Sequence, residues 1–411
     1  MKKWEILSKF KVYPFDKLRT KFKIDEHIHL LLQNRGISTK REIEDFLSPQ
    51  LDKITSKSVG IDQKQLKKAV KRIKDAIKKR EQIIVFGDYD VDGICGAAIL
   101  WETLNSLGAK VLPYIPHRID EGYGISLRSI VNIKNKISNI KLIITVDNGI
   151  VANEPVDFAN ENGIDVIITD HHVPSKKLPK AYSIVHTTKI CGAGVAYLLA
   201  QELKIQSSKF KIKEDNHLEL AALATVADLV PLIGPNRAIV KFGIEALRNT
   251  KRVGLLELFK EAAINQKQID TYQIGHIIAP RLNAMGRMES GMDSLRLLCT
   301  TKKERAQILA RELSSTNLER QNVTTEAVIH AKAQIVNNGS IGRLLFMAHE
   351  SYQQGVIGLV ASKLVEEYYV PSIVISKGDQ LSRASARSIS GFNIIEFIRS
   401  ASEFLVDAGG H

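Results

Sequence analysis

The sequence contains few cysteines. The 411 residues include three, Cys95, Cys191 and Cys299. Because they are odd in number and far apart, neither a disulfide framework nor a four-cysteine zinc site is indicated. Such cysteine usage is typical of a reducing compartment, and we predict a cytoplasmic location.

Long hydrophobic runs are also missing. No stretch approaches the roughly 18 apolar residues that a membrane-spanning helix needs. The basic N-terminus, MKKWEILSKFKVYPFDK, lacks the apolar core of a secretory signal. We therefore expect a protein that is not exported and that has no membrane among its partners.

Nucleotide-binding loops are absent as well. No G-x-x-x-x-G-K-[ST] sequence occurs, and GAGVAY lacks the last glycine of a dinucleotide fingerprint, which argues against an NTPase.

Acidic residues are fewer than basic ones, with 45 Asp and Glu against 58 Lys and Arg, which gives a net charge of +13. This charge favours polyanionic partners such as nucleic acid, although a solvated lysine face explains it equally well.

The hydrophobic pattern predicts an α/β protein. A helix with one apolar face is expected over residues 64–80, and from residue 82 short β-rich runs alternate with helical stretches, which is typical of a parallel sheet. Helices are also expected near 192–203 and 217–228, and a long one near 302–337. We predict a parallel-sheet domain joined by this long helix to a second, smaller α/β domain. The proposed divisions are an N-terminal segment 1–60, a catalytic domain 61–235, a helical region 236–338 and a substrate-binding domain 339–411 that is incomplete.

Acidic residues follow one predicted strand closely. The segment IIVFGDYDVDG places Asp88, Asp90 and Asp92 at the carboxyl end of that strand, the edge where open α/β sheets bind ligands. Carboxylates so close together repel one another unless cations compensate, which indicates divalent metals. A turn is the structural alternative. An EF-hand loop is disfavoured because its twelfth position, Ile99, should be Glu.

Two further strand ends and one helix end repeat the pattern. KLIITVDNG delivers Asp147, and VIITDHH delivers Asp170, His171 and His172. Mixed carboxylate and imidazole ligands suit Mn²⁺ or a similar ion. Asp228 ends the apolar segment LELAALATVADLVPL, where an unpaired buried carboxylate would be costly and where a capping or surface role is the alternative.

The motifs DYDVDG, VDNG, DHH and ATVAD, in this order, resemble those of the DHH phosphoesterases. The resemblance implies two Mn²⁺ or Mg²⁺ ions and hydrolysis of phosphodiester bonds. It implies one ion held by Asp88, Asp90 and Asp147, and a second held by Asp92, Asp147, His171 and Asp228. His172 would then face the scissile phosphate, and Asp170 would orient the histidines.

Other segments are similar to the RecJ family: NRGISTKREIEDFL, APRLNAMGRM, TNLERQ, QGVIGLVASKLVEEYYVPSIVI and SARSISGFN. This similarity implies a single-stranded-DNA exonuclease of recombination and repair that works 5′ to 3′ and releases mononucleotides. Helicases or single-strand-binding proteins would be its protein partners. The residues implied to bind nucleic acid, besides His172, are Arg281, Asn283, Arg287, Ser385, Arg387, Gly409, Gly410 and His411.

The chain departs from the RecJ pattern in three places. Tyr352, Gln353 and Gln354 stand where a Trp-His pair is usual, and the segment 184–192 is shorter than usual. The chain stops at the GGH motif, so we expect a truncated form without the nucleic-acid-binding OB-fold of longer relatives. Two alternatives stay open, namely a phosphodiesterase for short oligonucleotides or cyclic dinucleotides and a catalytically silent DNA-binding scaffold.

Overall fold

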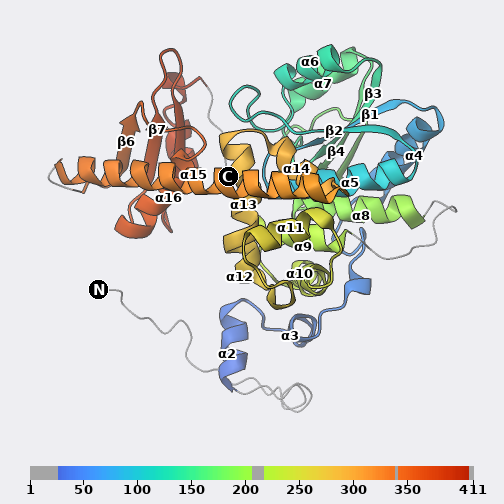
Figure 1. The fold of residues 1–411 in the computed structure, drawn as a ribbon, viewed down its shortest axis with the longest axis horizontal. Helices are drawn as coiled ribbons and strands as arrows, with labels where there is room; N and C mark the ends of the chain where they lie inside the picture. The colour runs from blue at the N-terminus through green and yellow to red at the C-terminus, as the bar shows by residue number, and fades with distance from the viewer. Residues whose placement is uncertain (1–25, 206–216, 338–340, 407–411) are drawn as a thin grey trace.

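The computed structural model describes residues 26–205, 217–337 and 341–406. Two bodies of unequal size are connected by one 35-residue helix, α15 (Lys303–Asn337), which runs across both of them (Figure 1). The predicted fold class is confirmed: a parallel-sheet domain is joined by a long helix to a smaller α/β domain. Residues 409–411, which were predicted to bind nucleic acid, lie outside the described residues.

The larger body is built on a five-stranded sheet in the order β2-β1-β3-β4-β5, and every pair in it is parallel. Its central strands are buried almost throughout, because helices cover both faces. This burial explains why the central strands read as continuous apolar runs. The strands are β1 (Gln82–Gly87), β2 (Lys110–Tyr114), β3 (Ile140–Val146), β4 (Asp165–Asp170) and β5 (Ser183–His186).

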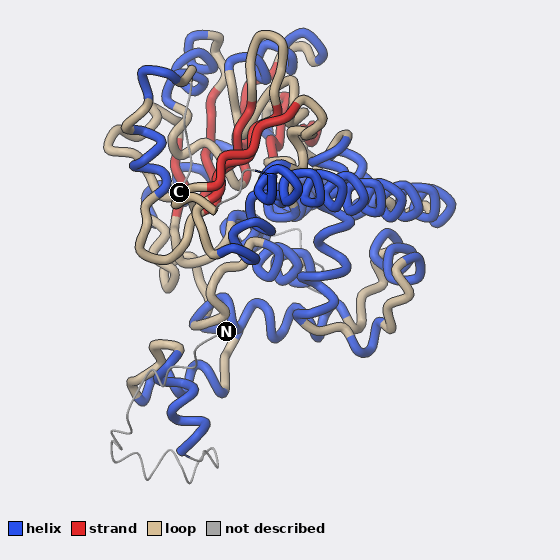
Figure 2. Tube along the Cα trace, turned by 90° about the vertical axis from the view of Figure 1, so that its left-hand side faces the viewer, coloured by secondary structure: helices blue, strands red, loops and turns tan. Residues whose placement is uncertain are grey.

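Helices divide between the two faces of this sheet (Figures 1 and 2). The side chains of α6 and α7 share a core with one face, and those of α4, α5 and α8 share a core with the other. Helix α6 and strand β5, which has only four residues, were not predicted. The helices are α4 (Gln63–Lys78), α5 (Val91–Ser106), α6 (Leu127–Lys136), α7 (Asn153–Glu161) and α8 (Gly192–Ile205).

A helical layer lies against α5 and α8. Its side chains, together with those of the first half of α15, continue the core beneath the sheet without a break. The boundary predicted at residue 235 runs through this core and stays a prediction. The layer comprises α9 (Leu218–Ala227), α10 (Gly234–Leu247), α11 (Val253–Glu261), η2 (Gln266–Gln268), α12 (Thr271–Gln273), η3 (Ile274–Ile278), α13 (Ala279–Met288) and α14 (Gly291–Cys299).

The second half of α15 packs on the smaller body through Ala327, Ala331 and Ile335. This body has three strands in the order β6-β7-β8, with β6 and β7 parallel and β8 antiparallel. Tyr352 lies in its core, and its hydroxyl is 3.0 Å from His330 Nδ1. The elements are β6 (Leu345–His349), α16 (Ile357–Tyr368), β7 (Ser372–Ser376), β8 (Arg383–Arg387), α17 (Ile394–Arg399) and η4 (Ser402–Phe404).

The first described residues form α2 (Glu26–Asn34), α3 (Lys40–Leu47) and η1 (Leu51–Lys53). Arg237 of α10 holds α3 in place, because its guanidinium lies 3.5 Å from the centroid of the Phe46 ring.

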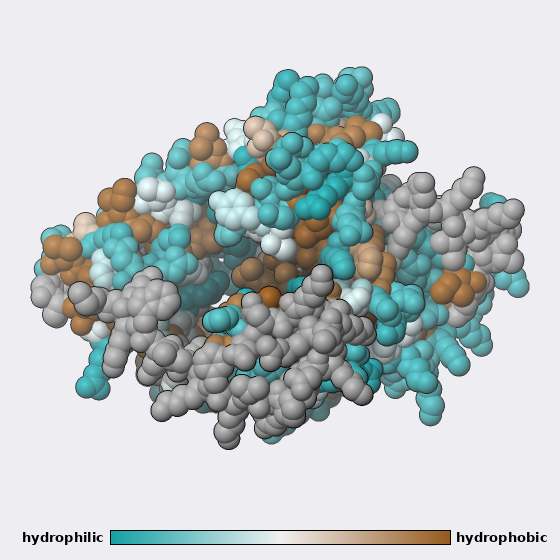
Figure 3. Space-filling view, turned by 90° about the horizontal axis from the view of Figure 1, so that it is seen from below, coloured by the Kyte–Doolittle hydropathy of each residue, from teal (hydrophilic) through white to brown (hydrophobic). Residues whose placement is uncertain are grey.

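Seen from below, the described surface is mostly hydrophilic and is hollowed near its middle (Figure 3). No helix within the described ranges combines the length and the apolar character needed to cross a membrane.

Candidate metal centre

The predicted acidic residues meet at the carboxyl edge of the larger sheet. Asp88 follows β1, Asp147 follows β3, and Asp170 is the last residue of β4. Since β1, β3 and β4 are adjacent parallel strands, their ends deliver these side chains to one place. Asp228, the C-terminal cap of α9, approaches the same place from the helical layer.

The loop between β1 and α5 and the first turn of α5 together carry three carboxylates. Asp90 caps α5, and its Oδ1 accepts hydrogen bonds from the backbone N–H groups of Asp92 and Gly93 at 3.0 and 3.1 Å. Gly93 packs so closely that a Cβ there would lie 2.4 Å from the Asp88 nitrogen. Asn283 Oδ1 accepts a bond of 2.9 Å from the Val91 N–H. The loop is therefore fixed by its own glycine and by α13.

Asp92 is held by the N-terminus of α8. Its two carboxylate oxygens accept hydrogen bonds of 2.7 Å each, from Gly192 N–H and Ala193 N–H. Unpaired N–H groups and the helix dipole favour a negative charge at this end of a helix. Since each carboxylate oxygen has a second lone pair, Asp92 can still bind a cation.

Asp147 occupies a left-handed backbone conformation, with φ of +63°. The next residue, Asn148, pins this turn: its Nδ2 donates to Val146 O at 2.8 Å, and its Oδ1 accepts from Ile125 N–H at 3.1 Å. A non-glycine residue in this region costs free energy and needs such support. The VDNG segment thus aims the Asp147 side chain at the site.

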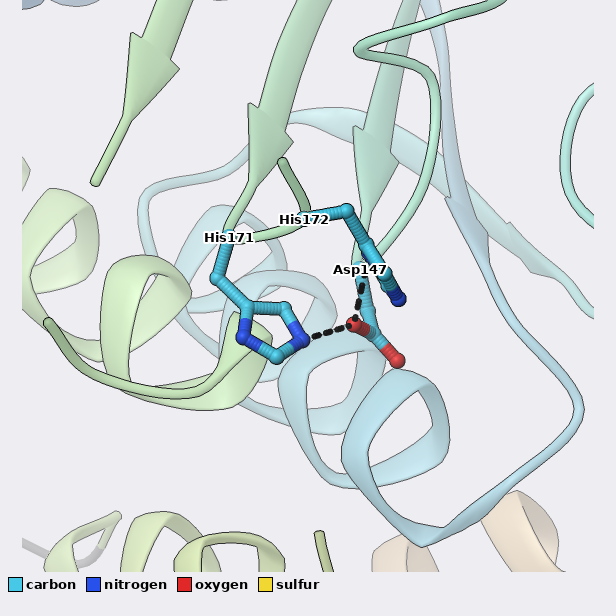
Figure 4. Close-up of side chains that lie close together, drawn as sticks. All are labelled: Asp147, His171 and His172. Atoms are coloured by element: carbon cyan, nitrogen blue, oxygen red, sulfur yellow. Dashed lines mark ion pairs between the residues drawn. The ribbon is translucent and has the colours of Figure 1, made fainter. Parts of the chain in front are cut away.

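The two histidines after β4 point toward Asp147 (Figure 4). His171 Nε2 lies 3.1 Å from Asp147 Oδ1, and His172 Nδ1 lies 3.9 Å from the same atom. Asp170 orients His172, since its Oδ1 is 2.8 Å from His172 Nδ1 and accepts from the backbone N–H groups of both histidines. Burial lowers the pKa of His172, but the bond to Asp170 more than offsets this, so the pKa is raised.

Three groups of side chains within the described residues could each hold an ion, because their ligand atoms lie within 4.8 Å of one another. One group is Asp88, Asp90 and Asp147, and another is Asp92, His171 and Asp228. His171 Nε2 is 3.6 Å from Asp92 Oδ2 and 3.7 Å from Asp228 Oδ2. The third group joins Asp147 to His171 and His172. Asp147 therefore belongs to two of these three groups, one with Asp88 and Asp90 and the other with His171 and His172. That it bridges two ions stays a prediction.

The ligand atoms fit a divalent cation. Asp88 Oδ1 and Asp147 Oδ1 are buried and accept no hydrogen bond. His171 Nε2 lies 3.1 Å from Asp147 Oδ1. Burial lowers the pKa of His171, so its ring is neutral and presents a lone pair. Acceptor atoms packed together without donors are costly unless a cation lies among them.

The same crowding raises the carboxylate pKa values. Burial comes first and the neighbouring aspartates second: they raise the pKa of Asp228 to about 8 and those of Asp88 and Asp147 well above the usual range. A divalent cation at the site would reverse this effect by favouring the ionised carboxylates. The site is therefore electrostatically unfavourable without metal at neutral pH.

This crowding predicts an unusual pH dependence for the metal-free protein. Between about pH 4, where these carboxyls titrate in the unfolded chain, and about pH 8, the folded state binds more protons, so the free energy of unfolding falls as pH rises. The lowered pKa of His171 opposes this trend only in part. We expect Tm in EDTA to fall by at least about 5 °C from about pH 5 to about pH 8. Saturating Mg²⁺ should remove most of the fall, and a Tm that rises with pH in EDTA would contradict the prediction.

Arginines gather beside the acidic site. Burial, and then the charges of Arg118 and Arg320, lower the pKa of Arg287 to about 10. Burial and Arg118 likewise lower the pKa of Arg387, and the Arg118 guanidinium lies 5.0 Å from the centroid of the Tyr89 ring. These mutually repelling cations, which we call the arginine cluster (Arg118, Arg287, Arg320 and Arg387), favour a bound anion.

The arginine cluster joins both bodies of the molecule. Arg287, at the end of α13, donates to Gly355 O at 3.3 Å, and a Cβ on Gly355 would lie 2.1 Å from Arg287 O. Ser385 and Arg387 of β8 lie near the start of α16, where a Cβ on Gly358 would be 3.0 Å from Ser385 Oγ and 3.3 Å from Arg387 Nη2. The smaller body thus contributes basic and hydroxyl groups beside the metal site.

Arg281 and Asn283, which were predicted to bind nucleic acid, also have partners within the protein. Arg281 donates to Ile277 O at 2.8 Å and to Ser314 Oγ at 3.3 Å, and so binds α13 to α15. Asn283 supports the acidic loop, as described above. Sequence reasoning missed Arg118 and Arg320, although Arg320 lies in the TNLERQ segment and its Nε is buried without a partner.

A buried ion-pair network connects the helices α5 and α9, which carry Asp92 and Asp228 at their ends. Arg252 of α11 binds Glu102 of α5 at 2.6 Å and Glu219 of α9 at 2.9 Å. Burial opposes ionisation of Glu102, but His217 and Arg252 lower its pKa to about 2. The network links the two helices whose ends carry Asp92 and Asp228, and so fixes the distance between these ligands.

Comparisons with known proteins agree with this geometry. Residues 82–226 match the DHH family, N-terminal domain. The chain is 37% identical over 405 residues to the single-stranded-DNA-specific exonuclease RecJ of Bacillus subtilis, covering 94% of this chain and 50% of that protein. It is 31% identical to RecJ of Salmonella typhimurium, covering 93% of this chain and 70% of that protein.

Solved structures show the same relationship. The crystal structure of RecJ from Thermus thermophilus in complex with Mn²⁺ matches with a TM-score of 0.81 and 29% identity, over 96% of this chain and 56% of that one. The chain spans about half the length of the first curated relatives it matches, 50% and 58%. From its similarity over nearly all its length, the chain belongs to the RecJ family of DHH proteins.

Proposed function

We propose that this chain is a metal-dependent exonuclease that hydrolyses single-stranded DNA from its 5′ end and releases 5′-mononucleotides. The observation that carries the proposal is the juxtaposition of two ligand sets, which share Asp147, with the arginine cluster. A phosphodiester needs both, since metal sites of this type act on phosphate and guanidinium groups bind it. The RecJ proteins that the chain resembles are named as single-stranded-DNA-specific exonucleases.

The residues proposed to hold one Mn²⁺ or Mg²⁺ ion are Asp88, Asp90 and Asp147. Those proposed to hold a second are Asp92, Asp147, His171 and Asp228. Two bound ions would supply an activated water and neutralise charge on the phosphate. Carboxylate and imidazole ligands suit these ions, and the solved RecJ structures contain Mn²⁺ or Mg²⁺.

The chain's own side chains position the substrate. Arg287 and Arg118 attract a phosphate to the acidic site, which would otherwise repel it. His172, with its raised pKa, can present a positive ring to the same phosphate, and Asp170 fixes the ring's orientation. Single-stranded DNA is the proposed partner, while helicase and single-strand-binding partners and the cytoplasmic location stay predictions.

The decisive test is Mn²⁺-dependent release of mononucleotides from 5′-labelled single-stranded DNA by the 411-residue chain. Duplex DNA, RNA and a dinucleotide are compared in parallel, and the Asp147→Asn variant is the control. Progressive degradation of the single strand supports the proposal. Cleavage of the dinucleotide alone would indicate an oligonucleotide phosphodiesterase, and no metal-dependent cleavage would indicate a binding scaffold.

The arginine cluster predicts a substrate-binding defect. Arg118→Gln removes one cation from the cluster, so we expect KM for single-stranded DNA to rise about 10-fold and the salt dependence of binding to weaken by about one charge. Arg128→Gln, an exposed arginine in α6, is the matched control and should leave both quantities unchanged. An unchanged KM in Arg118→Gln would remove Arg118 from the phosphate site.

A further inference from the structure

His172 is held by Asp170 at one ring nitrogen only. The bond from Nδ1 to Asp170 Oδ1, at 2.8 Å, fixes one corner of the imidazole. The ring is otherwise attached only through its Cβ–Cγ bond, about which it turns whenever the bond at Nδ1 opens. A second contact at Nε2 restricts this rotation further.

Tyr123 supplies this contact. Its hydroxyl lies 3.1 Å from His172 Nε2 and donates to the Asp147 backbone carbonyl oxygen at 3.2 Å. The Tyr123 ring is edge-to-face with the His172 ring at 5.9 Å and with the Tyr89 ring at 6.2 Å. The hydroxyl thus connects the histidine to the backbone of the shared metal ligand.

The loop that carries Tyr123 is docked on the metal site. Gly122 and Gly124 flank Tyr123 with φ of +82° and +63°, and a Cβ on Gly124 would lie 3.1 Å from the Asn148 Cβ. At its other end, both Glu121 carboxylate oxygens lie within 2.9 Å of the Tyr114 hydroxyl. Asn148, which fixes the Asp147 turn, therefore also fixes the position of the loop that carries Tyr123.

The hydroxyl can hold the ring in either protonation state. A neutral His172 accepts at Nε2, and Tyr123 can donate to it. A charged His172 donates from Nε2, and Tyr123 can then accept while donating to the Asp147 carbonyl. The Tyr123 side chain is 53% exposed, so it stands at the mouth of the site rather than in a sealed core. A purely structural tyrosine would not need this placement.

We propose that Tyr123 is a positioning residue for His172: its hydroxyl, together with Asp170, holds the imidazole facing the reacting phosphate. The inference rests on the proposed nuclease function and assigns Tyr123 a part in it. Without the hydroxyl, the ring samples orientations that do not face the phosphate, which lowers the rate of the chemical step more than it weakens substrate binding.

The test is a double-mutant cycle with His172 under saturating Mn²⁺. Tyr123→Phe should lower kcat about 10-fold or more, with KM within about 2-fold and Tm unchanged, because only a hydroxyl is lost. In a His172→Ala background the same substitution should have no further effect on kcat. Tyr272→Phe, which removes an exposed tyrosine hydroxyl from α12, should leave kcat unchanged.

The outcomes are distinct. An unchanged kcat in Tyr123→Phe, or the same loss with and without His172, would overturn the positioning role. Wild-type activity in the same assay tests the nuclease function separately. A readout independent of activity is the ring ¹⁵N spectrum of His172 in the metal-free protein, which should change in Tyr123→Phe and not in Tyr272→Phe. An unchanged spectrum would overturn the inference even in an inactive chain.

Discussion

The Asp147→Asn variant is expected to lose at least about 10³-fold in nuclease activity, because Asp147 is proposed to bind both ions and lies in two of the three groups of candidate ligands. Removing a residue that only hydrogen-bonds to a metal ligand lowers metal affinity or activity by about 10 to 100-fold. Removing a ligand that both ions share should lower activity further. Asparagine suits the left-handed backbone at this position, where φ is +63°. The substitution therefore tests the carboxylate with little change in backbone strain.

The same variant should become more stable without metal. Burial and the neighbouring Asp92, Asp90 and Asp88 raise the pKa of Asp147 well above its usual range, so its charge destabilises the empty site at neutral pH. Removing that charge should raise Tm in EDTA by a few degrees, about 2 to 4 °C per kcal/mol for a domain of this size. In contrast, the rise in Tm on adding Mn²⁺ should largely disappear, since this rise reflects metal binding to the folded state.

Thermal unfolding in EDTA and in Mn²⁺ measures both effects. Asp157→Asn, a substitution of the same kind on α7, is the matched control and should retain the stabilisation by Mn²⁺. If Asp147→Asn retained it too, the assignment of Asp147 as a shared ligand would be wrong. If the variant lost both activity and stability in EDTA, the carboxylate would instead have a structural role.

The acidic centre could be predicted from sequence because its residues directly follow predicted strands. Each carboxylate follows an apolar run, and parallel strands that neighbour one another must deliver their ends to one edge. The alternation of apolar runs with helical segments was enough to predict the fold class. The same reasoning did not detect β5, which has four residues, or α6, whose start depends on a capping box at Ser126.

Interactions between distant segments were not predictable in the same way. The hydrogen bonds from Gly192 and Ala193 to Asp92 join residues about a hundred positions apart, and they involve backbone groups that no residue type reveals. Arg118 joins the arginine cluster only because the loop after β2 folds over Tyr89. Arg281 has contacts that its motif does not reveal, since its guanidinium donates to Ile277 O and Ser314 Oγ. Its role in binding phosphate stays a prediction.

Gly192→Ala should lower the activity by about 10² to 10³-fold, although it replaces no ligand side chain. A Cβ at this position would lie 2.6 Å from the Asp147 Cβ, 2.8 Å from its Oδ1 and 2.9 Å from its Cα. Since backbone and Cβ atoms cannot turn aside, Asp147 or the first turn of α8 must shift. A shift of α8 would also break the 2.7 Å bond from Gly192 N–H to Asp92, so both ligand sets would be displaced.

Gly194→Ala is the matched control, because it lies in the same turn of α8. The three atoms nearest to its added Cβ all belong to Ile190, with Cβ at 3.2 Å, Cδ1 at 3.3 Å and Cγ1 at 3.4 Å. A shift of a few tenths of an ångström relieves these contacts, which is much less than Gly192→Ala requires. Alanine also favours the helix over glycine by about 0.5 to 1 kcal/mol. We therefore expect Gly194→Ala to keep near-normal activity and stabilisation by Mn²⁺, whereas Gly192→Ala should lose both. Equal activity in the two variants would mean that α8 can move away from Asp147 at little cost, and that its contacts with Asp92 and Asp147 do not set the geometry of the metal site.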